Sequence, residues 1–288
     1  MNSLKQLDFP MELDFPVEVL HSSKVLDPYF NPTPNMFFIT NTEEKTVYKE
    51  VSPKYKPVIY KEQYERTINL LLEHPEVDTS SMEVIHYWTA NKGRYRFRIL
   101  LPEMVIEPKV GDKIRNGLQG DNSYDLSSVM RMITKGERLI CENGMTTSDH
   151  TMRIARKHTK GLNMTKESEK ITLGISAFYD SEGTYQRWMA RYVDKDRIED
   201  LFKNTLTKNP AKNVKNKYNG KQFTYLMNDW DKQIRDTGRT LWSTYNVATA
   251  WATHSVPLRE GSQLALSQRN ENLVASMLNS TEWKELDV

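Results

Sequence analysis

One short run of the sequence alternates arginine with aromatic residues. It is the segment 94–98, RYRFR, and it follows Lys92 and a glycine. Successive side chains of a β-strand point to opposite faces, so the three arginines would share one face and the two aromatic rings the other. Arginines repeated about 7 Å apart along a strand suit a phosphodiester backbone. The alternative is a solvent-facing strand whose arginines pair with nearby acids, for which Glu83 and Glu103 are candidates.

This run lies in the most basic part of the chain. Residues 91–160 hold 14 Lys and Arg against 8 Asp and Glu, whereas residues 1–90 hold 8 against 14. The whole chain of 288 residues is nearly balanced, with 40 basic and 38 acidic residues, which excludes a uniformly polybasic protein. Two interpretations stay open: the middle segment binds a polyanion, or the acidic first segment neutralises it within the fold.

A second basic stretch covers residues 149–160. On a helix, His150, Arg153 and Lys157 would share one face, although basic residues at a helix C-terminus also complement the helix dipole. The two histidines of this stretch are eight residues apart, which is not a strong metal-binding spacing, so we expect no metal and no cofactor. The residues expected to bind nucleic acid are Lys92, Arg94, Tyr95, Arg96, Arg98, Tyr124, Arg131, Lys135, Arg153, Arg156, Lys157, His158 and Lys160.

Enzyme signatures are not found in the sequence. It has no phosphate-binding loop, nucleophile elbow, zinc-protease helix or dinucleotide fingerprint. The single cysteine, Cys141, excludes an internal disulfide and a Cys-rich zinc module, and its apolar neighbours indicate an inert thiol. We therefore expect a protein without catalytic activity. The alternative is a magnesium-dependent nuclease or nucleotide-processing enzyme that uses Asp121, Asp125 and Glu142 with His150 or His158.

The elements that must position these residues form an α+β pattern, β-rich in the first half and mostly helical in the second. Strands at 82–88 and 94–101 form a hairpin that carries the arginines, with Asn91 and Gly93 supplying positive φ angles in its turn. A second hairpin, 127–133 with 137–141, turns at Lys135-Gly136, and a helix runs from about 148 to 157. Further strands are expected at 36–40 and 45–51, and helices at 62–73, 167–192, 195–205, 223–254 and 261–283.

We divide the chain into an extended arm (1–20), an α+β core domain (21–165) and a helical region packed on that core (166–288). The arm contains two copies of Leu-Asp-Phe-Pro, at 7–10 and 13–16. Each proline favours an extended conformation in the preceding phenylalanine. The phenylalanines are expected to dock on a neighbouring subunit or, equally, on the core of their own chain.

Four motifs occur in a fixed order along the chain. They are NSYD at 122–125, RLICENGM at 138–145, RKHT at 156–159 and YNVAT at 245–249, the last followed by a histidine. As an ordered set they resemble the family known as "phage/plasmid-like protein", a domain of unknown function. The resemblance covers about residues 90–255.

The chain departs from this family at two positions. Leu126 stands where the family usually has glycine and Val247 where it usually has alanine, which affects the local turn and packing. The resemblance implies a phage, prophage or plasmid origin and a role directed at DNA, because such genes often lie beside replication and recombination functions. A basic hairpin backed by helices is also similar to the core of phage single-strand annealing proteins.

The expected function is single-stranded DNA binding in recombination or replication, with strand annealing as one form of it. Arginines would hold the backbone, Trp88, Tyr95 or Tyr124 would stack on bases, and a homo-oligomer would align the strand. A third possibility is a phage interaction protein that binds a host factor. No apolar run approaches the roughly 20 residues of a bilayer span and no secretory signal begins the chain, so we expect a location in the host cytoplasm and no membrane partner.

Overall fold

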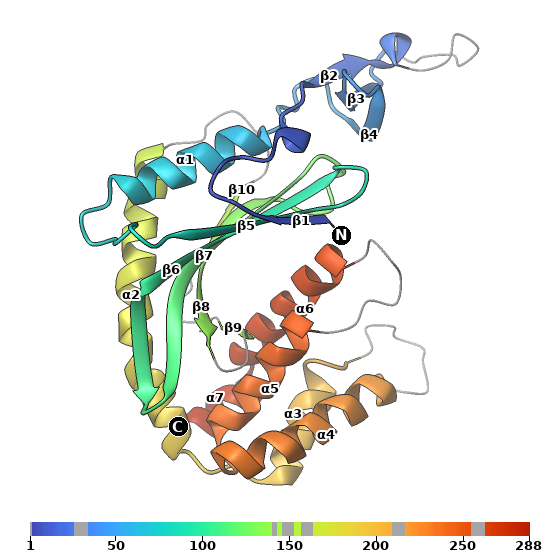
Figure 1. Cartoon of the computed structure of the whole chain (residues 1–288). Coiled ribbons are helices and arrows are strands. Elements are labelled where there is room, and N and C mark those ends of the chain that lie inside the picture. Colours follow the sequence, from blue (N-terminus) through green and yellow to red (C-terminus); the bar gives the residue numbers. More distant parts are fainter. Residues whose placement is uncertain are drawn as a thin grey trace. The chain divides into compact units, whose positions relative to one another are not determined.

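The structure is an α+β fold in which antiparallel strands make up the first half and helices the second, as expected from the sequence (Figure 1). No helix in the described part of the chain is long and apolar enough to cross a bilayer. The computed structural model describes residues 2–25, 34–139, 143–145, 153–156, 164–208, 217–254 and 263–288.

The larger sheet has seven strands in the order β1-β5-β6-β7-β8-β10, with β9 also paired to β8. Its register places Tyr87 opposite Arg96 and Ile85 opposite Arg98, which fixes the face on which each arginine lies. The strands are β1 Asn2–Lys5, β5 Glu83–Trp88, β6 Arg94–Lys109, β7 Asp112–Ser123, β8 Met130–Arg138, β9 Asn143–Met145 and β10 Arg153–Arg156.

A smaller antiparallel sheet has the order β2-β3-β4. It comprises β2 (Val17–His21), β3 (Phe37–Asn41) and β4 (Thr46–Val51), so the two short strands expected from the sequence are confirmed. Asn41 stabilises the turn between β3 and β4, because its side-chain oxygen accepts hydrogen bonds from the backbone N–H groups of Glu43 and Glu44.

Seven helices are described. The second of them is the longest, and the fourth to sixth contribute most of the helical core. They are α1 Tyr60–Leu72, α2 Met164–Ala190, α3 Lys195–Asn204, α4 Gly220–Thr237, α5 Leu241–His254, α6 Gln263–Leu278 and α7 Thr281–Asp287.

The chain forms two compact units, and strands β6, β7 and β8 contribute residues to both. Each unit has its own hydrophobic core. Unit 1 is Met1–Met104, Gly117–Thr134 and Met152–Ile175, and unit 2 is Val105–Asn116, Lys135–Thr151 and Ser176–Val288.

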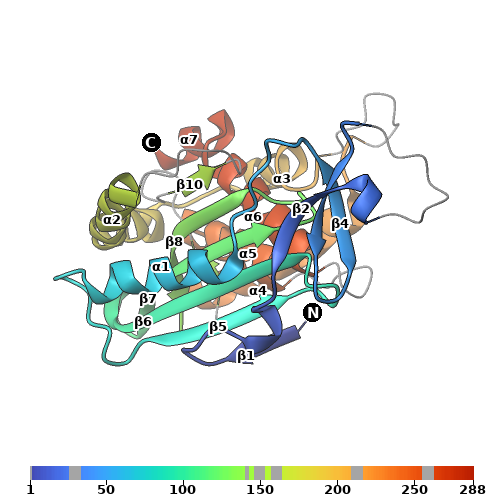
Figure 2. The ribbon, with the colours of Figure 1, turned by 90° about the horizontal axis from the view of Figure 1, so that it is seen from above.

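The core of unit 1 lies between α1 and one face of the larger sheet (Figures 1 and 2). Tyr64 and Leu71 of α1 pack against the strand residues Tyr95 and Phe97, all of them buried. Gly120 of β7 leaves room for this packing, since a β-carbon there would come within 2.2 Å of the Phe97 ring. The aromatic residues of the 94–98 run thus fill the core, and the arginines lie on the opposite face.

The core of unit 2 is built from aromatic residues of the helices. Trp230 of α4 and Trp242 and Tyr245 of α5 are fully buried, and the Trp230 indole donates a hydrogen bond to Thr244 (3.0 Å). All three residues lie in the segment 223–254, which is helical as expected from the sequence. That segment is nevertheless two helices, because Gly238 takes a φ of 79° and ends α4.

Two further expectations from the sequence are wrong. The segment 127–141 is not a hairpin, since β8 runs without a turn through Lys135 and Gly136, where the ladder to β9 continues to Met145. Arg153–Arg156 is strand β10, paired with β8, and not part of a helix, so Arg153 does not lie on a helical face as expected. Residues 146–152 and 157–163 lie outside the described residues.

The N-terminal arm packs on its own chain. Its first residues form β1 on the edge of the larger sheet, and Phe9 contacts the rings of Tyr64, His86 and Tyr95. Phe15 meets Tyr124 edge-on. Of the two partners expected for the phenylalanines, the structure shows the chain's own core.

Candidate nucleic-acid interface

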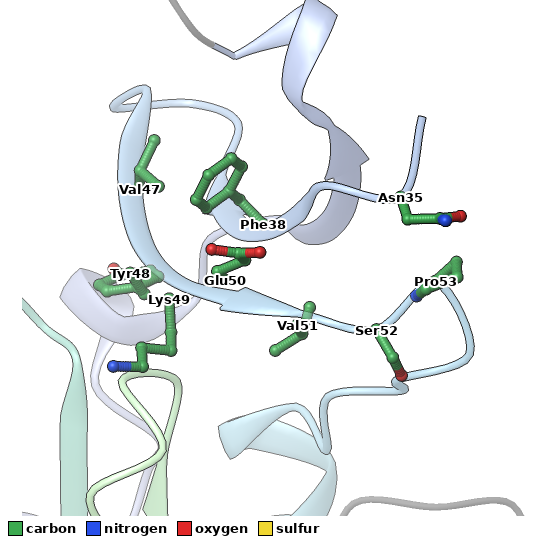
Figure 3. A pocket seen from close by; sticks show the side chains of 9 residues that line it. All are labelled: Asn35, Phe38, Val47, Tyr48, Lys49, Glu50, Val51, Ser52 and Pro53. Carbon is green, nitrogen blue, oxygen red and sulfur yellow. The ribbon is translucent and has the colours of Figure 1, made fainter. Parts of the chain in front are cut away.

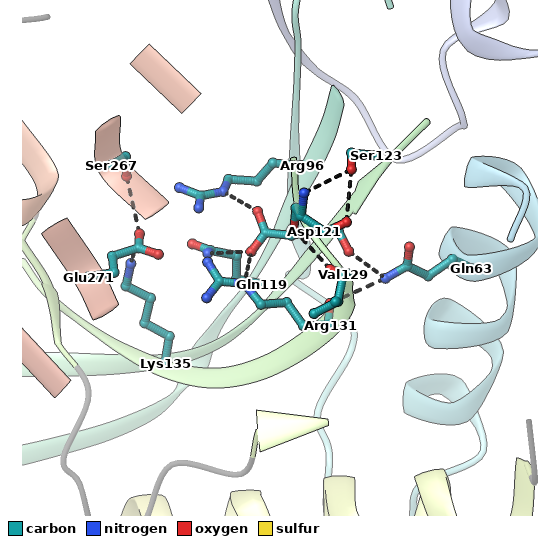
Figure 4. A network of polar contacts seen from close by, with 11 residues as sticks. Gln63, Arg96, Gln119, Asp121, Ser123, Val129, Arg131, Lys135, Ser267 and Glu271 are labelled. Atoms are coloured by element: carbon teal, nitrogen blue, oxygen red, sulfur yellow. Dashed lines mark hydrogen bonds and ion pairs between the residues drawn. The ribbon is translucent and has the colours of Figure 1, made fainter. Parts of the chain in front are cut away.

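Two arginines share one carboxylate on the face of the larger sheet that is turned away from α1 (Figure 4). Asp121 of β7 accepts a hydrogen bond from Arg96 Nε at 2.7 Å on one oxygen and from Arg131 Nε at 2.6 Å on the other. Only 5 % of Arg96, 3 % of Asp121 and 2 % of Arg131 are exposed. Arg96 and Arg131 therefore do not belong to an open phosphate ladder, which corrects the expectation from the sequence.

Neutral side chains complete this cluster. The Gln119 amide donates to Asp121 Oδ2 at 3.2 Å. From α1, the Gln63 amide donates to the backbone carbonyls of Asp121 (3.4 Å) and Arg131 (3.3 Å). Charged groups tolerate burial only when such partners replace the water of hydration. The cluster therefore fixes strands β6, β7 and β8 against one another and against α1.

Arg94 and Arg98 flank Arg96 along β6, and both are partly exposed. Arg94 Nε lies 2.7 Å from Asp125 Oδ2, and the side chains of this pair are 27 % and 22 % exposed. Arg94 and Arg96 thus pair with Asp125 and Asp121, whereas Glu83 pairs with Lys5. We call Arg94, Arg96, Arg98 and Arg131 the arginine face.

Lys92 turns towards the acidic first segment. It occupies the β5–β6 turn with a φ of 56°, a conformation that the sequence pattern favours at Asn91 and Gly93 instead. Its ammonium lies 2.5 Å from Glu44 and 5.5 Å from the centre of the Phe15 ring. At this position the acidic segment does neutralise a cation of the basic one.

The aromatic residues expected to stack on bases are buried. Tyr95 donates its hydroxyl to His86 Nδ1 at 2.8 Å within the core. Tyr124 stacks on Tyr60 at 3.9 Å between ring centres, and its hydroxyl accepts the Tyr60 backbone N–H. Trp88 is buried as well. None of these three rings can reach a base in this conformation.

The remaining expected residues are distributed over other parts of the chain. In unit 2, Lys135 is buried and pairs with Glu271 at 3.1 Å, and the Ser267 hydroxyl donates to the same carboxylate (Figure 4). Arg153 and Arg156 lie on β10. Residues outside the described part of the chain are Lys157, His158 and Lys160, together with Cys141, Glu142 and His150.

The carboxylates considered for a magnesium site are held by arginines. Asp121 is bound by two guanidinium groups, and Asp125 binds Arg94 and the backbone N–H of Ser127. Within the described residues, no group of three or more His, Cys, Asp and Glu is arranged to hold a metal ion. These contacts favour a structural role for both aspartates.

The polar side chains of the motif NSYD make hydrogen bonds to the backbone of neighbouring segments. The Asn122 amide donates to the Val58 carbonyl (3.0 Å), and the Ser123 hydroxyl donates to the Ser128 carbonyl (2.8 Å) and accepts the Ser128 N–H (3.0 Å). Ser123 and Asp125 thus fix the connection from β7 to β8, and Asn122 fixes β7 to the segment that precedes α1. The motif YNVAT lies within α5, where every one of its side chains is buried.

One residue of this face was not among those expected from the sequence. Tyr87 of β5 is partly exposed and lies opposite Arg96 in the register. The alternation of β5 could have identified Tyr87. Val84, His86 and Trp88 are buried on one face of this strand, so Tyr87 lies on the other.

The described residues also form concavities elsewhere. A groove of about 760 Å³ runs over the smaller sheet, between Phe38, Val47 and the connection that follows β4 (Figure 3). It carries one lysine and one glutamate, Lys49 and Glu50, which do not converge on a common point. A cavity of about 830 Å³ in unit 2 has Asp112, Arg138 and Trp242 among its lining residues. Arg138 is held there by Asp112 at 2.5 and 2.8 Å.

Comparison with curated proteins and with solved structures gave no match. One family model does match, and it covers residues 47–277, a span that includes α1, the arginine face and the motifs NSYD and YNVAT. The chain therefore belongs to the family described as a domain of unknown function, DUF932.

Proposed function

We propose that this protein binds single-stranded DNA through the arginine face and acts, without catalysis of its own, in recombination or replication. The observation that carries the proposal is the alignment of Arg94, Arg96 and Arg98 on one face of β6, joined there by Arg131. Three of these guanidinium groups, those of Arg94, Arg96 and Arg131, bind two carboxylates, Asp121 and Asp125. Such an excess of positive charge favours a polyanion.

The arginines divide into two groups under this proposal. Arg96 and Arg131 are buried and stabilise the sheet through Asp121. Arg94 and Arg98 are partly exposed and are the groups that contact phosphates. Arg94 contacts the Asp125 carboxylate through its Nε. A guanidinium group binds carboxylates and phosphates in the same geometry, so Arg94 is suited to exchange this carboxylate for a phosphate.

The proposal also covers the origin of the protein, its compartment and its assembly. We place the protein in a phage, prophage or plasmid context in the host cytoplasm, where it forms a homo-oligomer on the strand. Strand annealing is the activity that such an assembly would support. The proposal draws on the order of elements, an antiparallel sheet followed by helices (Figure 1).

The test is oligonucleotide binding by fluorescence anisotropy over a series of salt concentrations. We expect the wild type to bind a labelled oligothymidylate, and Arg94→Ala/Arg98→Ala to bind at least tenfold more weakly. The slope of log K against log salt should fall by about 0.7 for each phosphate that the variant no longer neutralises. Lys54→Ala/Lys56→Ala removes two exposed cations between β4 and α1 in the same unit and serves as the control.

Three results would decide the matter. Weaker binding confined to the arginine variant supports the arginine face. An equal decrease in both double variants would show that only net charge matters and would refute the assignment. A wild type that binds no oligonucleotide would refute the proposed function itself.

A further inference from the structure

Tyr87 lies among the cations of the arginine face. In β5 its neighbours His86 and Trp88 are buried against α1 and the arm, so Tyr87 points to the opposite face. The register sets it directly opposite Arg96, with Ser3 of β1 on its other side. Arg94 and Arg98 are its diagonal neighbours on β6, at distances of about 7–8 Å that a long side chain spans.

The Tyr87 ring differs from the buried tyrosines of the same unit. Tyr95 and Tyr124 are fully buried, stack on other rings and hydrogen-bond through their hydroxyls. In the described part of the chain Tyr87 has no ring contact and no hydrogen bond through its side chain, and it is partly exposed. An aromatic ring of this kind has a π-face available to a ligand.

An aromatic ring flanked by arginines is the arrangement by which proteins bind single strands, because cations hold the backbone while bases stack on the ring. In a duplex both faces of each base are covered by its neighbours, and only an unpaired base can stack on a side chain. We propose that Tyr87 stacks on an unpaired base whose flanking phosphates contact Arg94 and Arg98. This inference rests on the proposed function and names the residue that selects single strands over duplex.

The test compares three proteins on three probes. The proteins are Tyr87→Phe, which keeps the ring, Tyr87→Leu, which keeps apolar bulk without it, and wild type. The probes are an oligothymidylate, an abasic oligonucleotide of the same length and charge, and a duplex. Thermal unfolding of each variant establishes that it is folded.

We expect Tyr87→Leu to bind the oligothymidylate about tenfold more weakly, the order of effect for removal of one base stack. Tyr87→Phe should match the wild type, and all three proteins should bind the abasic probe and the duplex equally. Equal binding of the oligothymidylate by Tyr87→Leu and wild type would overturn this inference alone. So would an equal decrease on the abasic probe, since that indicates a structural role. A wild type that binds none of the probes would overturn the proposed function as well.

Discussion

Arg96 and Asp121 form an ion pair of 2.7 Å in which both side chains are almost completely buried. The same carboxylate also binds Arg131, so one anion serves two guanidinium groups from different strands. Removal of one member of a buried ion pair is far more destabilising than removal of a surface pair, because the remaining charge keeps its desolvation cost. The centre of the arginine face is therefore a strong determinant of the fold.

The first prediction concerns this shared carboxylate. Asp121→Asn keeps the shape of the side chain but removes the negative charge that Arg96 and Arg131 share. We therefore expect it to lower the free energy of unfolding by about 3–5 kcal/mol. Asp125→Asn, on the partly exposed pair with Arg94, should cost less than about 1 kcal/mol. Urea unfolding measures both. Equal decreases in the two variants would contradict a special role for the buried pair.

The alternation of the 94–98 run correctly predicted which side chains share a face. It could not predict what the arginines meet, because their partner Asp121 is 25 residues from Arg96 in sequence and is brought close by the pairing of β6 with β7. The same alternation, applied to β5, would have identified Tyr87. It would also have shown that Trp88 and Tyr95 belong to the core.

Two errors in the elements have separate physical causes. Lys135-Gly136 has the composition of a turn, but both residues lie within β8, where Gly136 pairs with Met145 of β9, and strand pairing outweighs the local preference. The end of α4 at Gly238, by contrast, could have been predicted from the sequence, because glycine adopts a positive φ at little cost. The Gly238 N–H donates to the Ile234 carbonyl and closes the helix. Buried residues lie on both sides of that glycine, Trp230 in α4 and Leu241 in α5, so the hydrophobic pattern alone did not mark the break.

The second prediction concerns the pH dependence of stability. His86 is fully buried, where its Nε2 donates to the Gln6 carbonyl (3.0 Å) and its Nδ1 accepts the Tyr95 hydroxyl (2.8 Å). Burial lowers the pKa of His86 below its ordinary value of 6.5, against the smaller, opposite effect of the bond to Gln6. The groups that face the ring, Tyr64, Tyr95 and Phe9, carry no charge near neutral pH, because burial raises the pKa of both tyrosines.

The neutral form of His86 is therefore the one that the fold stabilises. The unfolded chain binds a proton at pH 6.5 and below, whereas the folded chain resists protonation until a lower pH, so the stabilisation is fully present above pH 6.5 and declines as the pH falls through the window below it. We expect the free energy of unfolding to drop by up to about 1.4 kcal/mol per pH unit there. His86→Asn should flatten this dependence in urea titrations between pH 5 and 7.5. An unchanged slope in the variant would assign the effect to other groups.

The third prediction concerns the close approach of β7 to the core. Gly120 faces the Phe97 ring so closely that a β-carbon would lie 2.2 Å from two of its atoms, and the Phe97 ring also contacts Tyr64 of α1. Gly120→Ala must therefore displace the ring or the strand, and we expect a decrease of about 1–3 kcal/mol in the free energy of unfolding. Phe97→Leu, which removes the obstructing ring, should reduce the additional cost of the alanine in a double-mutant cycle.

A matched control for this substitution is Gly183→Ala in α2. No atom lies within 4 Å of the β-carbon that it would add, and alanine has a higher helix propensity than glycine by about 1 kcal/mol. The same chemical change should thus stabilise the protein at position 183 and destabilise it at position 120. Thermal and urea unfolding of the two single variants would show opposite shifts. Shifts of the same sign would mean that the contact between Gly120 and Phe97 does not decide how β7 packs against the aromatic core of unit 1.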